Sequence, residues 1–289
     1  MSSPHTALLA RRAATVRGIR EFFDALGYVE VETPVRIAAP APEPHIDCPP
    51  VSTGGFLRAS PELQMKKLLA AGMDRIYQIG PCFRDGEKGS RHNPEFTMLE
   101  WYSKSEDYLD MADGLETLFR RLAAGHAPQL AERAGSPFRR VTVREAYGIW
   151  AGWDPWTAWD QDRFDFDMAT KIEPAIAADG GGTFLVDYPR EAASLARIRG
   201  DVAERWEFYW DGLELANCFG ELCDGAEQSR RFGEAREARR TLGEADYPVD
   251  GEFLSSLDAI GEASGAALGV DRLVMCLTGA PDISSVRAF

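Results

Sequence analysis

The stretch from Phe83 to Tyr102 holds the residues whose types and spacing best suit chemistry. The pattern predicts a strand that ends in Arg84, a polar loop over residues 86–94, and a second strand that returns. Because side chains alternate along a strand, Glu100 and Tyr102 lie on one face of it. A carboxylate beside a phenol suits a primary ammonium ion, and Arg84 can fork onto a phosphate or a carboxylate. The alternative is a solvated hairpin whose charged groups face water.

A second candidate group is a pair of carboxylates, Glu214 and Glu221, that flank Asn217. Hard cations prefer oxygen ligands, so this segment is suited to holding Mg²⁺ against the phosphates of a nucleotide. The alternative is that both are ordinary surface carboxylates, which are common in any chain.

A third candidate group is the glycine-rich run from Gly265 to Leu273. Its small residues let a backbone approach a ligand closely. Arg272 falls in the first turn of the predicted helix that follows, and a helix N-terminus with a guanidinium suits a phosphate or an adenine. A glycine-rich join between a strand and a helix is common, so the run is weak evidence by itself.

The elements that must position these groups follow from the apolar pattern. Helical spacing predicts a helix over residues 6–26, with Gly27 as its C-terminal cap. Alternation predicts a strand over residues 28–33. The Pro-rich run 39–50 is typical of an ordered loop or a flexible flap. Ser60, as an N-cap before a proline and a glutamate, is typical of a helix start.

The remaining elements favour an α+β fold with an antiparallel sheet flanked by helices. Further helices are expected at 108–124, 162–178, 226–242 and 252–260. Strands are expected at 29–33, 56–59, 75–84, 95–102, 184–188 and 206–217, with Asp211-Gly212 as a tight turn inside the last. Their hairpin-length or irregular joins disfavour a Rossmann fold. The chain has neither a dinucleotide-binding glycine motif nor a P-loop.

Composition sets the broad class of the protein. The chain has 289 residues, 45% of them hydrophobic and 27% charged, which is typical of a globular protein. The five cysteines form no C-x-x-C pair, which disfavours a disulfide framework or a zinc site. The formal net charge of −14 disfavours autonomous binding to nucleic acid. We expect a cytoplasmic protein without membrane association, because no apolar run reaches spanning length and no secretory signal pattern is present.

Taken together and in order, these segments resemble the three motifs of class II aminoacyl-tRNA synthetases. Leu26 to Pro34 resembles motif 1, Phe83-Arg84 with residues 91–97 resembles motif 2, and Gly265 to Arg272 resembles motif 3. RHNPEFTMLEWY is similar to the lysyl branch, and VAERWEFYWDGLELAN and ASGAALGVDRLVM are similar to its subgroup of elongation factor P–(R)-β-lysine ligases. The resemblance spans residues 6–287. It implies a single catalytic domain over 1–289, because motif 1 begins too early to leave room for an N-terminal OB-fold anticodon domain.

The resemblance also implies a role for each matching residue. Arg84 and Arg272 match catalytic positions that hold phosphate. The positions implied for ATP are Arg84, Asp85, Gly86, Asn93, Glu214, Leu215, Gly269 and Arg272. Those implied for the amino acid are Ser60, Pro61, Glu62, Glu100, Tyr102, Asn217, Glu221 and Ala267. Glu214 and Glu221 match carboxylates close to Mg²⁺. Four of these residues, Glu62, Glu100, Tyr102 and Glu221, suggest an anionic pocket with no cation of its own, which calls for a substrate with two ammonium groups.

The function implied is ATP- and Mg²⁺-dependent activation of lysine or (R)-β-lysine as an adenylate, followed by transfer to a lysine side chain of elongation factor P. The resemblance also implies a homodimer, built on motif 1, and no stable binding of tRNA. Alternative functions are a paralogue that aminoacylates another acceptor and a non-catalytic module that binds a nucleotide or an amino acid.

Four positions depart from the patterns of the wider family. Gly86 replaces the motif 2 glutamate. Two consequences are open: the neighbouring Glu87 substitutes for it, or the affinity for ATP is reduced. Cys218 and Gly220 replace a glycine and a histidine and are expected to border the amino-acid pocket. Ala267 replaces the glycine of lysyl-tRNA synthetases and matches the β-lysine subgroup.

Overall fold

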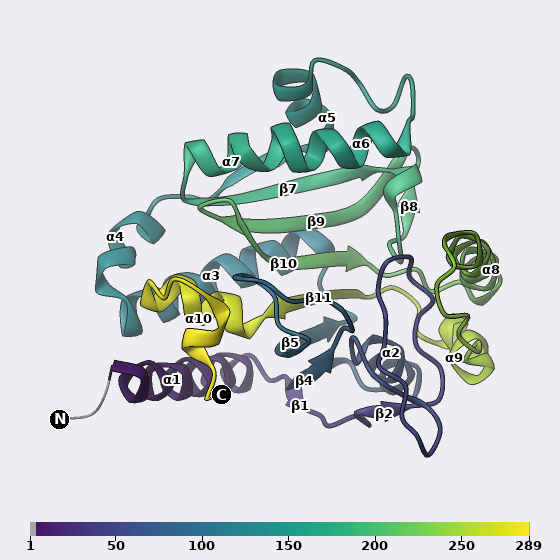
Figure 1. Cartoon of the computed structure of the whole chain (residues 1–289), viewed down its shortest axis with the longest axis horizontal. Helices are drawn as coiled ribbons and strands as arrows, with labels where there is room; N and C mark the ends of the chain where they lie inside the picture. The colour runs from purple at the N-terminus through teal and green to yellow at the C-terminus, as the bar shows by residue number, and fades with distance from the viewer. Residues whose placement is uncertain (1–3, 289) are drawn as a thin grey trace.

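The computed structural model describes residues 4–288, and these build one large mixed sheet with helices on its faces (Figure 1). The order of neighbouring strands is β1-β4-β5-β11-β10-β9-β7-β6, and β8 pairs with β9. In that order the bounds are Val29–Glu30, Arg75–Phe83, Glu95–Ser103, Ser264–Gly269, Leu213–Gly220, Val202–Trp210, Gly182–Pro189 and Arg139–Thr142, with Ile198–Arg199 for β8.

The predicted antiparallel sheet is confirmed for its six central strands, from β4 to β7. Both edges differ, because β1 pairs with β4 and β6 pairs with β7 in parallel. A parallel pair needs a long crossover connection. Helix α2 (Glu62–Ala70) lies in the first crossover. The second crossover begins with α5 (Val143–Ala146) and η1 (Tyr147–Ala151). A continuous run of helix follows, made of α6 (Gln161–Asp167), η2 (Met168–Ile172) and α7 (Glu173–Asp179).

One face of the central sheet is covered by four helices, namely α1 (Pro4–Ala25), α3 (Tyr108–His126), α4 (Pro128–Gly135) and α10 (Val270–Thr278). Apolar side chains from these helices, among them Phe23, Phe119 and Val274, form one buried cluster with Trp101 and Phe208 of the strands. Burying a side chain of this size contributes roughly 1.5–3 kcal/mol. This cluster holds the strands in place from the face that the four helices cover. The opposite face of the strands forms the floor of a cleft.

A second group of helices lies beside the strand ends near α2. It comprises α8 (Gly225–Leu242), α9 (Gly251–Ser256) and η4 (Leu257–Ala259), and its apolar side chains pack with those of α2. The short strands β2 (Arg36–Ile37) and β3 (Phe56–Leu57) pair beside it, and the remaining short helices are η3 (Arg190–Ala192) and η5 (Ile283–Val286). No helix among residues 4–288 is long and apolar enough to cross a membrane.

Most predicted helices and the β9–β10 hairpin are confirmed, and Asp211 and Gly212 have the positive φ angles, 50° and 75°, that its tight turn requires. The predicted strand over residues 28–33 is only two residues long. Pro61, not Ser60, is the N-cap of α2, although the Ser60 hydroxyl still accepts a hydrogen bond from the Glu62 amide. Sequence patterns missed α4 and β6.

Candidate active site

The open face of the sheet carries a cleft whose two halves share part of their lining. One, called here the Arg272 half, lies between α10, the 86–94 loop and the start of β10. The other, called the Glu100 half, lies between β5, β10, β11 and α2. The residues common to both halves are Arg84, Met98, Glu214, Asn217 and Ala267. The structure therefore brings the three candidate groups of the sequence together on one floor.

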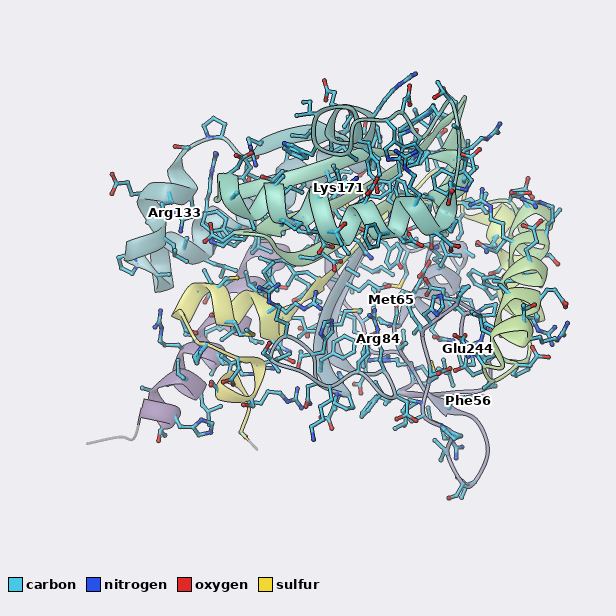
Figure 2. The ribbon with its side chains drawn as sticks, turned by 45° about the horizontal axis from the view of Figure 1, so that its top comes forward. Phe56, Met65, Arg84, Arg133, Lys171 and Glu244 are labelled. Atoms are coloured by element: carbon cyan, nitrogen blue, oxygen red, sulfur yellow. The ribbon has the colours of Figure 1, made fainter. Side chains whose placement is uncertain are left out.

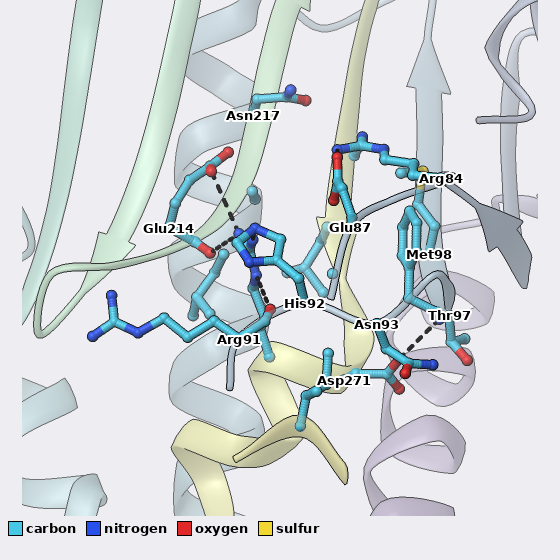
Figure 3. Close-up of a pocket in the computed structure, with 18 residues that line it drawn as sticks. Arg84, Glu87, Arg91, His92, Asn93, Thr97, Met98, Glu214, Asn217 and Asp271 are labelled. Atoms are coloured by element: carbon cyan, nitrogen blue, oxygen red, sulfur yellow. Dashed lines mark hydrogen bonds and ion pairs between the residues drawn. The ribbon is translucent and has the colours of Figure 1, made fainter. Parts of the chain in front are cut away.

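Arg84 lines both halves of the cleft, and Figure 3 shows it among the residues of the Arg272 half. It directly follows β4, and its guanidinium lies over the Phe96 ring, 5.3 Å from the centroid. Its one ion pair, with Glu87, is long at 3.6 Å, and its buried Nε has no hydrogen-bond partner among the described residues. A buried, unsatisfied guanidinium N–H is costly, so the group is suited to an anionic ligand.

Arg272 is held from three sides. Its Nη1 donates to the Glu214 carbonyl oxygen at 2.9 Å, its Nε donates to the Arg91 carbonyl at 3.2 Å, and its Nη2 lies 2.7 Å from His92 Nε2. Burial and the positive charge of Arg272 lower the pKa of His92, so the imidazole is neutral at pH 7 and can accept this hydrogen bond. The guanidinium is thus fixed at the start of α10 with little freedom to move.

The other positions predicted to bind ATP divide into two groups. Asn93, Leu215 and Gly269 line the Arg272 half. Asp85 and Gly86 are exposed and do not line the cleft; the Asp85 amide instead donates to the Asp47 carbonyl at 2.7 Å. Glu87 does line the cleft beside Arg84, which supports the expectation that it takes the place of the missing motif 2 glutamate.

The Glu100 half is built around one buried carboxylate. Glu100 is 2% exposed and accepts hydrogen bonds from Tyr102 Oη at 2.6 Å and Ser60 Oγ at 2.7 Å. Burial, followed by the charge of Glu62, raises the pKa of Glu100 to about 7. Of the other positions predicted for the amino acid, Glu62, Tyr102, Asn217, Glu221 and Ala267 line this half, whereas Pro61 is buried and does not.

The expectation that the pocket lacks a cation is wrong, because Arg84 and Arg205 line this half and Lys66 pairs with two of its carboxylates. Lys66 is completely buried and forms ion pairs with Glu62, at 2.5 Å, and with Glu221. These two partners raise the pKa of Lys66 against the effect of burial, which keeps it charged. The pocket is therefore less anionic than the sequence suggested. The spacing of Glu62 and Lys66, four residues apart on a helix, is the signal that could have revealed this pair.

Two small residues of β11 shape the floor of the Glu100 half. A Cβ atom at Gly265 would lie 2.2 Å from Tyr102 and 2.4 Å from Glu221, so only glycine lets these side chains meet above the strand. Ala267 pairs with Glu100 across the β5–β11 ladder. Ala267 lines both halves of the cleft.

Cys218 and Gly220 do not border the pocket, contrary to expectation. Cys218 is buried in the apolar cluster behind the sheet, with Sγ near the Tyr108 carbonyl. A Cβ atom at Gly220 would meet the Glu204 carboxylate at 2.3 Å. Side chains alternate along β10, and Asn217 and Glu221 occupy the cleft side. These two substitutions therefore leave the cleft surface unchanged.

A single metal ion shared by Glu214 and Glu221 does not fit the structure. Seven residues of a strand span roughly 20 Å, which is beyond the joint reach of two carboxylates on one ion. Glu207 is the more suitable neighbour of Glu214, because burial in the cleft and the charge of Glu207 raise the pKa of Glu214. The sequence analysis missed Glu207, which faces the cleft from β9.

The Glu207–Glu214 pair fits a divalent cation in its chemistry. Two carboxylates that repel one another at the cleft floor are stabilised by a hard cation with oxygen ligands. Among residues 4–288, no three acidic, histidine or cysteine side chains converge on one point. An ion here would therefore need oxygens of a bound phosphate or water to complete its coordination, as Mg²⁺ usually does.

Comparison with known proteins agrees with this geometry. The family model of class II tRNA synthetases (D, K and N) matches residues 2–289. The elongation factor P–(R)-β-lysine ligases of Proteus mirabilis and Vibrio cholerae are 36% and 35% identical, over 99% and 100% of this chain and 96% and 97% of their own. That of Photorhabdus laumondii is 36% identical over 98% of this chain and 94% of its own. The chain therefore belongs to the class II synthetases of the D, K and N type, within the family of the elongation factor P–(R)-β-lysine ligases.

Proposed function

We propose that this protein uses ATP to activate a diamino acid, (R)-β-lysine in preference to lysine, and transfers it to a lysine side chain of elongation factor P. The observation that carries the proposal is the division of charge in the cleft. Arg84 and Arg272 present guanidinium groups in one half, and Glu100 with Tyr102 presents an ammonium site in the other. A triphosphate and an amino acid bound in these halves would meet at Arg84.

The reaction we infer has two steps. A carboxylate oxygen of the amino acid attacks the α-phosphorus of ATP, and the bond to the β-phosphate breaks to release pyrophosphate. The lysine amine of the acceptor then attacks the acyl carbon, loses a proton and displaces AMP to form an amide. The chain's residues do no covalent chemistry; Arg84 and Arg272 bind the phosphates, and Glu100 orients the amino acid.

Mg²⁺ bound near Glu214 and Glu207 would neutralise phosphate charge as it develops on the leaving group. Arg84 acts on the same charge from the opposite side of the cleft junction. Its unsatisfied Nε and its stacking on Phe96 suggest a guanidinium that is already oriented before a nucleotide binds. Orientation in advance is what makes such groups effective in the transition state.

The acceptor and the amino acid are inferred from three further facts. The relatives are named as ligases that join (R)-β-lysine to elongation factor P. The alanine at position 267 places a methyl group opposite Glu100, where it favours one placement of the ammonium groups over another. The acidic chain, with its formal charge of −14, disfavours tRNA as the acceptor.

The activation step is tested by pyrophosphate exchange with different amino acids. Exchange should depend on (R)-β-lysine, more weakly on lysine, and not on leucine. A response to leucine equal to that to the diamino acids would contradict the ammonium site. Absence of exchange with every amino acid, in protein that still binds ATP, would favour the non-catalytic alternative.

A further inference from the structure

We propose that Glu43, in the 39–50 loop, is a further substrate-binding residue whose carboxylate contacts one of the two ammonium groups of the diamino acid. This inference rests on the proposed function and adds a specificity residue to the same site. Glu43 lines the Glu100 half together with Ser60, Glu62 and Tyr102. It comes from a loop and not from the sheet, so it lines the pocket from a different element than Glu100 does.

Glu43 differs from the other carboxylates of this half in having no partner. Within residues 4–288 its side chain makes no hydrogen bond and no ion pair. The others are all engaged: Glu62 and Glu221 by Lys66, Glu100 by Ser60 and Tyr102, Glu207 by Arg205 and Tyr209, and Glu214 by Arg272. Burial, followed by the charge of Glu62, raises the pKa of Glu43 to about 6. At pH 7 it remains mostly ionised and available to a cation.

The position of Glu43 is fixed by a buried arginine from α8. Arg239 is completely buried, and its Nη1 donates to the backbone carbonyls of Glu43 at 2.7 Å and Ile46 at 3.1 Å. Its Nη2 donates to Asp47 at 2.6 Å, and its guanidinium lies over the Tyr247 ring. The loop is therefore held in place by α8, which lies near it (Figure 1).

Two further contacts tie the same loop to its surroundings. The Tyr247 hydroxyl accepts a hydrogen bond from the Cys48 amide at 2.8 Å, and the His45 amide donates to Glu244 at 3.2 Å. Figure 2 shows Glu244 beside the loop that leads to Phe56, with Arg84 farther inside. With the backbone held on both sides, Glu43 and Ile46 are the residues of this loop that line the cavity, and Glu43 is the charged one. This is the arrangement expected of a binding residue and not of a linker.

Among the described residues, Glu43 and Glu100 are the two carboxylates lining this half that form no ion pair with a cation of the chain, so each suits one ammonium group of the substrate. Lys66 forms ion pairs with Glu62 and Glu221. Glu100, which accepts a hydrogen bond from Tyr102, forms no ion pair within residues 4–288. A single free carboxylate matches one ammonium group. Glu43 supplies the second, and it does so from a different wall, so that the two groups are recognised at separate points. Binding the two ammonium groups at separate points would let the site discriminate between diamino acids by the distance between their two nitrogens.

The test measures binding of (R)-β-lysine and two singly charged analogues, one without the β-ammonium group and one without the ε-ammonium group. Dissociation constants are determined by calorimetry for the wild-type protein, Glu43→Gln and the control Glu191→Gln. Glu191 is an exposed carboxylate on the neighbouring rim that does not line the Glu100 half, so its substitution removes the same charge from the same region.

Glu43→Gln should weaken binding of (R)-β-lysine about tenfold or more, by loss of a charged hydrogen bond, while Glu191→Gln changes it less than about twofold. The penalty should vanish for one analogue, the one lacking the ammonium group that Glu43 contacts, and persist for the other. The KM for ATP and the melting temperature should not change. Glu43→Asp should fall between wild type and Glu43→Gln.

An unchanged affinity in Glu43→Gln, or a penalty of equal size for both analogues, would overturn the inference, since it would show that Glu43 does not contact an ammonium group. Wild-type protein that binds no diamino acid would overturn it as well. A failure of the proposed function would look different. Wild-type protein would bind the diamino acid and Glu43→Gln would weaken that binding, but elongation factor P would not be modified. In that case the role of Glu43 stands and the acceptor is another molecule.

Discussion

Substitution of Glu100 by glutamine tests the amino-acid half of the cleft most sharply, because it removes charge and preserves shape. The glutamine carbonyl can still accept from Tyr102, and its amide can donate to the Ser60 hydroxyl, which is free to rotate. We therefore expect little loss of folding stability. Binding of the diamino acid should weaken by about 1.5–3 kcal/mol, the usual contribution of a hydrogen bond to a charged group. That corresponds to roughly 10- to 150-fold in the dissociation constant.

The pH dependence gives the same substitution a second signature. The pKa of Glu100 is raised to about 7, so the carboxylate is ionised above that pH and protonated below it. An ammonium group binds the ionised form directly but must displace a proton from the neutral form. The dissociation constant of the diamino acid should therefore rise by about tenfold per pH unit below pH 7. In Glu100→Gln this dependence should flatten, leaving only the weaker dependence from Glu43, whose pKa is about 6.

The assay is pyrophosphate exchange at pH values from about 6 to 8, with the KM for ATP measured in parallel. Glu95→Gln is the matched control, because Glu95 lies on the same strand but at its exposed start, paired with Arg287 at 3.1 Å. The control should behave as wild type. If Glu100→Gln loses ATP affinity and keeps amino-acid affinity, the two halves of the cleft have been assigned the wrong way round. A pH dependence identical to wild type would remove Glu100 from ammonium binding.

Three further predictions follow from other parts of the structure. Arg84→Ala should lower the exchange rate by at least about a hundredfold, roughly 3 kcal/mol in the transition state, and wild-type exchange would remove Arg84 from the site. Lys66→Met should destabilise the fold by about 3–5 kcal/mol in urea, because it leaves the buried carboxyl groups of Glu62 and Glu221 without their cation. The loss should grow from about pH 7 to about pH 9, because the pKa of Glu221 is about 8 with Lys66 beside it and rises further without it. Sedimentation at micromolar concentration should show a homodimer whose interface covers the exposed side chains of Leu26 and Val29 in the motif 1 segment. Leu26→Asp should dissociate this dimer, and a monomeric wild-type protein would refute the interface.

The local pattern of the chain was enough to predict much of the fold. The helix that becomes α1, the hairpin around Asp211-Gly212 and the strand that carries Glu100 and Tyr102 all follow from apolar spacing and turn chemistry. Side chains also alternate along β10, which places Cys218 and Gly220 on the side away from Asn217. The alternation therefore already argued against placing these two residues at the amino-acid pocket. The parallel edges of the sheet depend on where the crossovers pack, which no local pattern specifies.

The charges of the site were harder to foresee, because they depend on elements that meet only in the folded chain. Lys66 reaches Glu221 across more than a hundred and fifty residues of sequence. Glu43 enters the pocket because a buried arginine on α8 holds its loop. In both cases the residue type gave no signal by itself, since isolated lysines and glutamates are usually exposed. Tertiary structure decides which of them become part of a site.

The central claim is that the chain joins a diamino acid to a protein. The most direct measurement is the intact mass of purified elongation factor P after incubation with this protein, ATP and (R)-β-lysine. The account predicts a gain of one β-lysyl residue that requires ATP, disappears with Arg84→Ala, and disappears when the acceptor lysine of elongation factor P is replaced by arginine. An elongation factor P of unchanged mass, in a reaction where wild-type protein still carries out (R)-β-lysine-dependent pyrophosphate exchange, would contradict it.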